Sequence, residues 1–155
     1  MSRIIQTGET AAKRRHAHLR SCAEALRLLA QNPALGLGRF DDEAKDMTAF
    51  LVFNLRGITA TIEESAQSWD DRNYWKKAEK LRADWRWARF AADDLQGLAL
   101  AGRWADVPPK LIELVPRFQS VTVTQHTRDA DWWVGAYRAL RKEAAREKGE
   151  VRSGK

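Results

Sequence analysis

Three arginines at helical spacing are the clearest chemical feature of the sequence. Arg82, Arg86 and Arg89 recur at intervals of four and three, and Trp75 lies two turns earlier on the same line. Guanidinium groups in a row fit the phosphates of a nucleic-acid backbone, and tryptophan stacks on bases. The same arginines also suit ion pairs with acids of a neighbouring helix, such as the helix expected before them. The spacing therefore indicates either a phosphate-binding row or interhelical ion pairs.

Two further groups of cations lie near the ends of the chain. Residues 1–20 and residues 138–155 each carry a net charge of +4, which leaves residues 21–137 at −2 within the total of +6. A run of charge usually marks a solvated face, but basic ends on a near-neutral body also fit a polyanionic partner. The candidate nucleic-acid-binding residues in these two groups are Lys13, Arg14, Arg15, Arg20, Arg138, Arg141 and Lys142, with Arg146 beside them.

The histidines and the single cysteine do not form a metal site. His18 and Cys22 are four residues apart and share a helix face, whereas His16 points about 200° away from His18 on a helix. Two converging ligands fall short of the four that a structural zinc site needs. We therefore expect no metal and no other cofactor.

Adjacent carboxylates are the remaining candidates for acid-base or metal chemistry. Two of these pairs fall where helices are expected to begin, so helix capping explains them, and the members of the other two diverge by about 100° on a helix. The sequence also lacks a glycine-rich phosphate loop, a nucleophile elbow and a Glu-x-x-His pair. We expect a protein that is not an enzyme, with a metal-dependent helical enzyme as a remote alternative. The four pairs are Asp41-Asp42, Glu63-Glu64, Asp70-Asp71 and Asp93-Asp94.

Trp87 and Phe90 lie on a different side of their helix from the other apolar residues. The chain holds seven tryptophans, a residue type that serves cores, interfaces and base stacking alike. Because large exposed apolar patches are uncommon, we expect the last helix to bury Trp87 and Phe90. The alternative is that these two side chains form a partner interface, since aromatic residues are typical interface anchors.

Apolar residues recur at intervals of three and four through most of the chain, which predicts an all-α fold. We expect a single-domain antiparallel helical bundle of about four to five helices, with the second helix at its centre. The core face of the third helix is predicted to run from Tyr74 through Leu81, Trp85 and Leu95 to Ala99. The expected helices are 9–31, 42–69, a third that ends near 101, a short one that begins at 107–109, and 129–146.

Breaks and caps set the expected ends of these helices. Asp41 and Asp42 suit the start of the second helix, Asp70-Asp71 the break and cap before the third, and Gly102 its end. Gly57, inside the second helix, is expected to allow a close helix crossing. Residues 119–124 are expected to form one extended strand or a connector.

Length and composition indicate one domain in a reducing compartment. The 155 residues include one cysteine and no apolar run long enough for a membrane span, and the opening residues lack the apolar core of a signal peptide. We expect a cytoplasmic protein with a helical bundle domain at 1–146 and a flexible basic tail at 147–155.

In size, helix content and charge, the chain resembles the small helical subunit of type III CRISPR effector complexes. That family lines a filament and contacts nucleic-acid strands through basic side chains. The chain also resembles, at the same level, the basic helical-bundle accessory protein of diversity-generating retroelements, which binds RNA with a reverse transcriptase. No motif is matched residue by residue, so no site residue is taken from either family.

These resemblances imply a non-enzymatic subunit of a larger ribonucleoprotein or antiviral defence complex. Its partners would be nucleic acid, with RNA ahead of DNA, and protein subunits, and no membrane would be involved. A homo-oligomer is one form that such an assembly could take. The alternative is a protein-protein interaction or oligomerisation subunit that uses the aromatic surface of Trp87 and Phe90.

Overall fold

The computed structural model describes residues 9–153, and these residues contain helices and no strand. The all-α prediction is therefore confirmed. The α-helices are α2 (Ala11–Ala30), α3 (Asp42–Asp71), α4 (Trp75–Leu100), α5 (Val107–Leu114), α6 (Ala130–Trp133) and α7 (Ala136–Ser153). Three short 3-10 helices complete the order: η1 (Pro33–Leu37), η2 (Trp104–Asp106) and η3 (Val115–Phe118).

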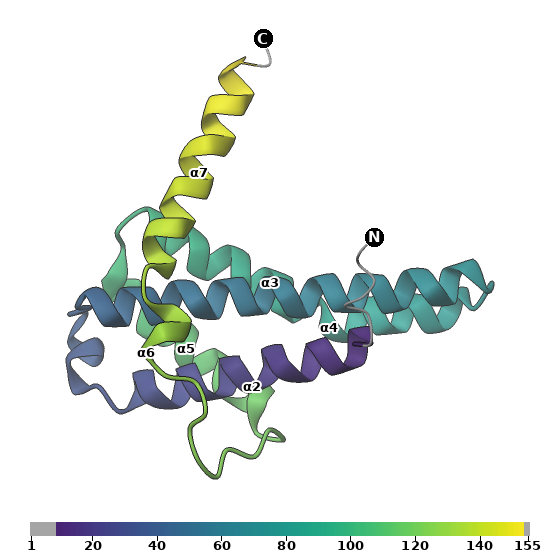
Figure 1. Ribbon diagram of the computed structural model, residues 1–155, viewed down its shortest axis with the longest axis horizontal. Coiled ribbons are helices and arrows are strands. Elements are labelled where there is room, and N and C mark those ends of the chain that lie inside the picture. Colours follow the sequence, from purple (N-terminus) through teal and green to yellow (C-terminus); the bar gives the residue numbers. More distant parts are fainter. Residues whose placement is uncertain (1–8, 154–155) are drawn as a thin grey trace.

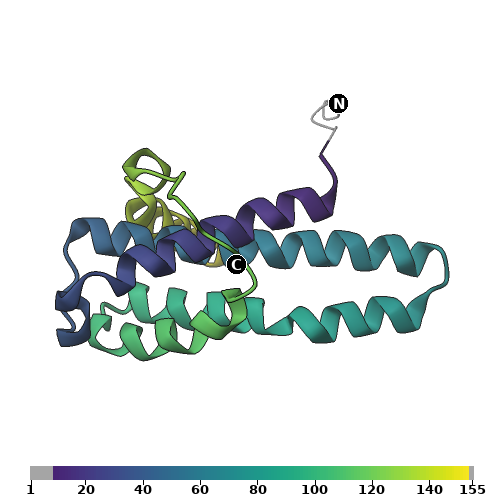
Figure 2. The ribbon, with the colours of Figure 1, turned by 90° about the horizontal axis from the view of Figure 1, so that it is seen from below.

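The long helix α3 is the centre of the bundle, as the sequence predicts. Figure 1 shows α2 and α4 running along it, and α3 also contacts α6 and α7. Helices α3 and α4 form an antiparallel hairpin, whose outer end extends beyond the other helices in Figure 2. Leucine, isoleucine and alanine side chains from facing helices make one continuous core, which buries Cys22, Leu26, Leu29, Leu51, Leu55, Ile58, Ala88, Leu95, Ala99, Leu111 and Leu140.

Local signals in the sequence explain most of the helix ends. The Asp41 carboxylate accepts a hydrogen bond from the Ala44 N–H at 2.8 Å, so it caps α3 as predicted. Gly102 follows α4 with a φ of 71°, which is the left-handed conformation that glycine adopts at helix ends. A Cβ at Gly57 would overlap the His18 ring, so this glycine lets α2 cross closely over α3 as expected.

The predicted cap at Asp70-Asp71 is wrong. Helix α3 continues through Asp71, and α4 begins only at Trp75, after a turn in which Asn73 has a φ of 66°. Asp70 instead accepts a hydrogen bond from Arg82 at 2.9 Å, so its carboxylate links two helices rather than starting one. Tyr74, predicted on the core face, is exposed in this turn.

The last helix is interrupted where one continuous helix is predicted. Helix α6 ends at Trp133, and Gly135, with a φ of 83°, redirects the chain into α7. Helix α7 continues to Ser153, so the part of the predicted tail that the structure describes is helical. Arginine, glutamate and lysine favour helix there, and the one glycine, Gly149, does not stop it. Residues 154–155 lie outside the described part.

The segment 119–124 belongs to a connector, residues 119–129, which links η3 to α6. The guanidinium of Arg20 donates to the Gln125 carbonyl at 2.6 Å, and that of Arg27 donates to the Val123 carbonyl at 3.1 Å. Both arginines belong to α2, so side chains of α2 rather than a neighbouring strand satisfy the backbone of this connector.

Candidate nucleic-acid interface

Arg82 is committed to the α3–α4 hairpin. Its guanidinium donates to the Glu63 carboxylate at 2.8 Å and to Asp70 at 2.9 Å. The hydrogen bonds to Glu63 and Asp70 raise the pKa of Arg82 above its ordinary value, and the bond from Arg82 lowers the pKa of Glu63. The structure thus shows for Arg82 the interhelical ion pairs that the sequence offered as one alternative. Because its guanidinium already faces two carboxylates, Arg82 is less available to a phosphate than an unpaired cation is.

The other two arginines of the row remain accessible. Arg86 is exposed, and Arg89 is exposed with the Asp93 carboxylate 3.9 Å from its Nε. Trp75 lies at the start of α4, and it is separated from Arg86 and Arg89 by the paired Arg82. The three arginines are therefore two accessible side chains, Arg86 and Arg89, and one that is engaged in interhelical ion pairs.

Three of the four cations predicted near the N-terminus also hold the fold together. Arg14 donates to both oxygens of Glu64, at 2.7 and 2.8 Å, and Arg15 donates to Thr61 and Ser65. Arg20 donates to Glu24 and to the connector. Within the described residues, Lys13 alone of the four is exposed without an ion pair.

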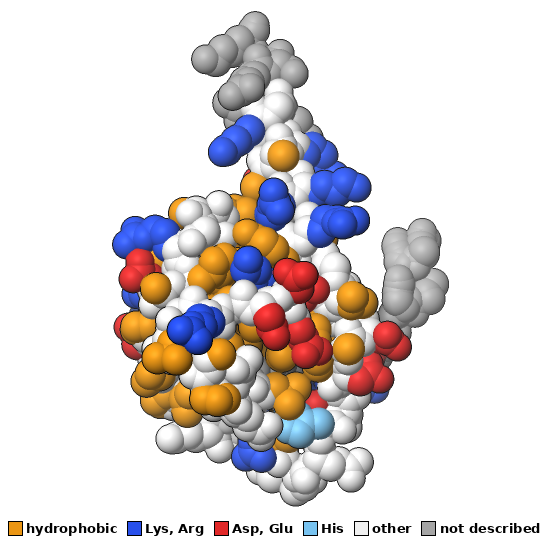
Figure 3. All heavy atoms as spheres, turned by 90° about the vertical axis from the view of Figure 1, so that its left-hand side faces the viewer, with side chains coloured by type: hydrophobic (Ala, Val, Ile, Leu, Met, Phe, Trp, Pro, Cys, Tyr) orange, Lys and Arg blue, Asp and Glu red, His pale blue; other side chains and the backbone are white. Residues whose placement is uncertain are grey.

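Helix α7 presents its cations to solvent. On a helix of 3.6 residues per turn, its five described cations fall within an arc of about 160°, while Leu140 lies outside that arc and is buried. Figure 1 shows α7 projecting away from the bundle, and Figure 3 shows lysine and arginine side chains gathered along it. This surface, which we call the α7 basic face, consists of the exposed residues Arg138, Arg141, Lys142, Arg146 and Lys148.

Contacts with the opposite side of α7 fix its direction. The Asp46 carboxylate accepts hydrogen bonds from the backbone N–H groups of Gly135 at 3.2 Å and Tyr137 at 3.0 Å, next to the first turn of α7. Glu143 pairs with Arg56 of α3 at 2.7 Å, and Arg56 also donates to Gln96. Glu143 thus faces the bundle, and the basic face points outward.

The structure also shows two neighbouring exposed aromatic residues, of which the sequence reasoning singled out Trp75 as a stacking residue and placed Tyr74 in the core. At the turn between α3 and α4, the side chain of Tyr74 is 52% exposed and that of Trp75 is 66% exposed. The Arg72 guanidinium and the Lys77 amine lie 5.6 and 5.4 Å from the centre of the Tyr74 ring. The signal available in the sequence was the Tyr-Trp pair between Arg72-Asn73 and Lys76-Lys77.

Trp87 and Phe90 have different environments. Trp87 is half-buried against Trp85 and Phe118, and the Arg117 guanidinium lies 5.1 Å from its ring centre. The cover comes from η3, so the prediction that the last helix buries both residues is wrong. Phe90 is 55% exposed and borders a hollow of about 190 Å³ lined by residues of α4, α5 and η3.

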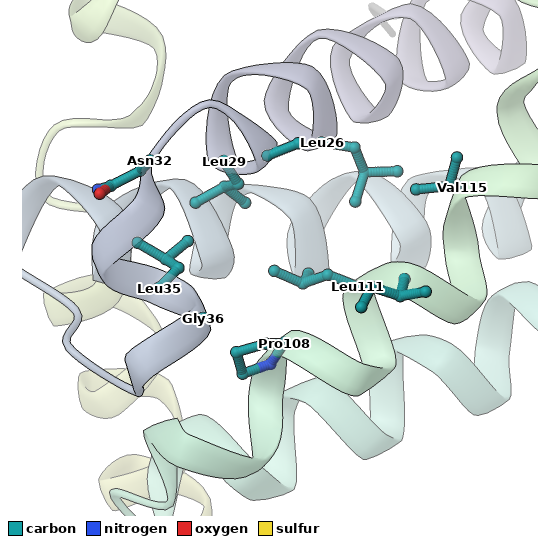
Figure 4. Close-up of a pocket in the computed structure, with 10 residues that line it drawn as sticks. Leu26, Leu29, Asn32, Leu35, Gly36, Pro108, Leu111 and Val115 are labelled. Carbon is teal, nitrogen blue, oxygen red and sulfur yellow. The ribbon is translucent and has the colours of Figure 1, made fainter.

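An apolar hollow of about 240 Å³ lies between α2, η1 and α5. Figure 4 shows Leu26, Leu29 and Leu35 on one side of it and Leu111 with Pro108 on the other. None of its ten lining residues carries an acidic or a basic side chain.

His18 and Cys22 of α2 are engaged in packing, whereas His16 is exposed. Cys22 is fully buried, which raises the pKa of its thiol, and His18 Nδ1 lies 2.8 Å from the Asn54 side-chain oxygen. Among the described residues, no three histidine, cysteine, aspartate or glutamate side chains gather closely enough to hold a metal ion. In the same part of the chain, no helix is both long enough and apolar enough to cross a membrane.

Comparisons of the chain with protein-family models, with curated proteins and with solved structures give no match.

Proposed function

We propose that this protein is a non-enzymatic subunit that binds the sugar-phosphate backbone of RNA or DNA. The observation that carries the proposal is the α7 basic face, a set of exposed cations on a helix that projects from the bundle. Exposed cations gain affinity for a polyanion by releasing its counterions, whereas paired cations such as Arg82 contribute little.

The arrangement favours binding without sequence recognition. The cations of α7 are flexible side chains on a helix surface, and such contacts to phosphates position a nucleic acid but do not read its bases. Arg86 and Arg89 on α4 and Lys13 on α2 add exposed positive charge elsewhere on the molecule.

An experiment with matched variants tests the role of α7. The variant R138A/R141A/K142A removes three cations from the basic face, and R39A/R103A/R117A removes three exposed cations outside it. We expect the α7 variant to bind a labelled 20-nucleotide RNA about tenfold or more weakly at moderate salt, and the control to stay within about threefold of the parent protein. Fluorescence anisotropy measures both affinities.

Equal losses in the two variants would contradict a dedicated α7 surface. Circular dichroism serves as the folding control, and both variants should keep the helix content of the parent protein because alanine is the strongest helix former.

We further propose that the protein works in the cytoplasm within a larger ribonucleoprotein or defence complex, with RNA as its nearer partner. The buried, unpaired Cys22 is consistent with a reducing compartment. The resemblance in size, helix content and charge to the small subunit of type III CRISPR effector complexes supports the proposal that the protein assembles with other protein subunits.

A protein partner at Phe90 is the second candidate function. Phe90 is 55% exposed at the rim of the hollow that Trp87, Lys110 and Arg117 also line. An aromatic side chain beside a hollow is the kind of anchor that protein interfaces use. Under this proposal F90A would abolish an association that R138A/R141A/K142A leaves intact, and pull-down with each variant separates the two surfaces.

A further inference from the structure

The outer end of the α3–α4 hairpin carries an exposed aromatic surface among cations. We call this surface the hairpin tip and define it as Arg72, Tyr74, Trp75, Lys76 and Lys77. Figures 1 and 2 both show this end extending beyond the rest of the bundle, so no other described element covers it.

The exposure of the two rings is built into the turn. The backbone N–H groups of Arg72 and Tyr74 both donate to the Trp69 carbonyl, at 3.1 and 2.9 Å, and that of Asn73 donates to Asp70 at 2.9 Å. With Asn73 at a φ of 66°, the chain reverses within this hydrogen-bonded turn. Tyr74 and Trp75 are therefore held outward by an ordered backbone.

The charges around the rings favour an anionic partner. The acids of the turn are engaged: Asp70 pairs with Arg82, and Asp71 accepts a hydrogen bond from Gln67 at 3.0 Å. Lys80 pairs with Asp84, and Glu79 is an exposed acid one turn into α4. Arg72, Lys76 and Lys77 remain as exposed cations beside the rings.

We propose that the hairpin tip binds unpaired bases of a single-stranded nucleic acid, with Trp75 and Tyr74 as stacking surfaces and the three cations on the adjoining phosphates. Base stacking on aromatic side chains combined with basic residues is how sequence-tolerant single-strand binding works. The inference rests on the proposed backbone-binding function and adds a preference for single strands, because the base faces of a duplex are already stacked.

The hairpin tip lies at the end of α3, and α7 is anchored to the middle of the same helix. Arg56, which anchors α7 through Glu143, and Arg72 are separated by about 24 Å at a rise of 1.5 Å per residue. A single strand that contacts both surfaces must span a distance of this order, and its bases would then meet Trp75 and Tyr74 at the tip.

The test compares Y74A/W75A with F90A/W132A in the full chain. The control removes two aromatic side chains of similar exposure elsewhere, since Phe90 is 55% and Trp132 51% exposed. Each protein is titrated with a 20-nucleotide single-stranded RNA and with a 20-base-pair RNA duplex. We expect the tip variant to lose about tenfold or more in single-strand affinity and less than about twofold in duplex affinity, whereas the control changes neither.

The stacking interpretation also predicts a rescue. Y74F/W75F keeps two aromatic faces, so it should retain most of the single-strand affinity that Y74A/W75A loses. Because the tip side chains are exposed, thermal unfolding of all these variants should match that of the parent protein.

The outcomes separate this inference from the proposed function. If R138A/R141A/K142A weakens binding while Y74A/W75A has no effect, the inference is overturned and the proposed function stands. If the parent protein binds neither of these RNAs nor DNA strands and duplexes of the same length, both are overturned. Two other outcomes would also overturn the inference. If the parent protein binds vesicles of anionic phospholipid and Y74A/W75A does not, the hairpin tip is a membrane contact. If Y74A/W75A alone changes its oligomeric state, the tip is an interface with a second copy of the chain.

Discussion

At the scale of single residues, Glu24 joins α2 to the connector before α6. Its buried carboxylate accepts hydrogen bonds from the N–H groups of Thr127 at 2.7 Å and Arg128 at 2.9 Å, and from Arg20 at 2.5 Å. His126 Nδ1 lies 3.6 Å away. Burial would raise the pKa of Glu24, but these hydrogen bonds outweigh burial and lower it from 4.5 to about 2.

This carboxylate should make stability depend on pH in a defined window. Because the folded pKa lies below the ordinary value, the stabilisation is present above pH 4.5 and is lost as pH falls towards about 2. It amounts to on the order of 3 kcal/mol, and we expect E24Q to lose a similar amount near neutral pH. Urea unfolding of both proteins should show the difference shrinking below about pH 4, and a constant difference would contradict this role for Glu24.

The residues also show where sequence reasoning reached its limit. Arg14 and Arg82 are both arginines on helix surfaces, and the sequence gives no local sign that either is paired. The partner of Arg14 is Glu64, fifty positions further along the chain, so only the packing of α2 on α3 brings the two together. The exposed Arg138 and Arg141 have the same local character, and only the direction of α7 distinguishes them.

At the scale of elements, the α3–α4 hairpin is held by Arg82 as well as by apolar packing. We expect R82A to lower the midpoint of thermal unfolding by a few degrees, since the arginine bridges two partly exposed carboxylates. It should leave RNA affinity within about twofold of the parent protein. Thermal unfolding and anisotropy measure the two effects, and a large loss of affinity without a loss of stability would contradict the structural assignment of Arg82.

Helix periodicity predicted these elements well and their junctions less well. The seam through Leu51, Leu55 and Ile58 identified the central helix, because burial on several sides leaves a strong pattern in the sequence. The break at Gly135 was not predicted, because a glycine inside a helical pattern is compatible with either a continuous helix or an interrupted one. Tertiary contacts determine the break, because the Asp46 carboxylate accepts hydrogen bonds from the backbone N–H groups of Gly135 and Tyr137 where α7 begins.

At the scale of the whole molecule, the two basic ends of the chain have different fates. Residues 1–20 and 138–155 carry equal net charge, but Arg14, Arg15 and Arg20 contact α3, Glu24 and the connector. The described cations of α7 project into solvent instead. The net charge and the position of the cations along the chain could be predicted from the sequence. Which of these cations are exposed to a partner could be determined only from the three-dimensional structure.

The salt dependence of RNA binding tests the central claim most directly. Each phosphate contact to a single strand contributes about −0.7 to the slope of log affinity against log salt, so the five cations of the α7 basic face predict a slope of about −3 or steeper. The variant R138A/R141A/K142A should lessen that slope by about two. A slope near zero for the parent protein, or an unchanged slope in the variant, would contradict backbone binding through α7.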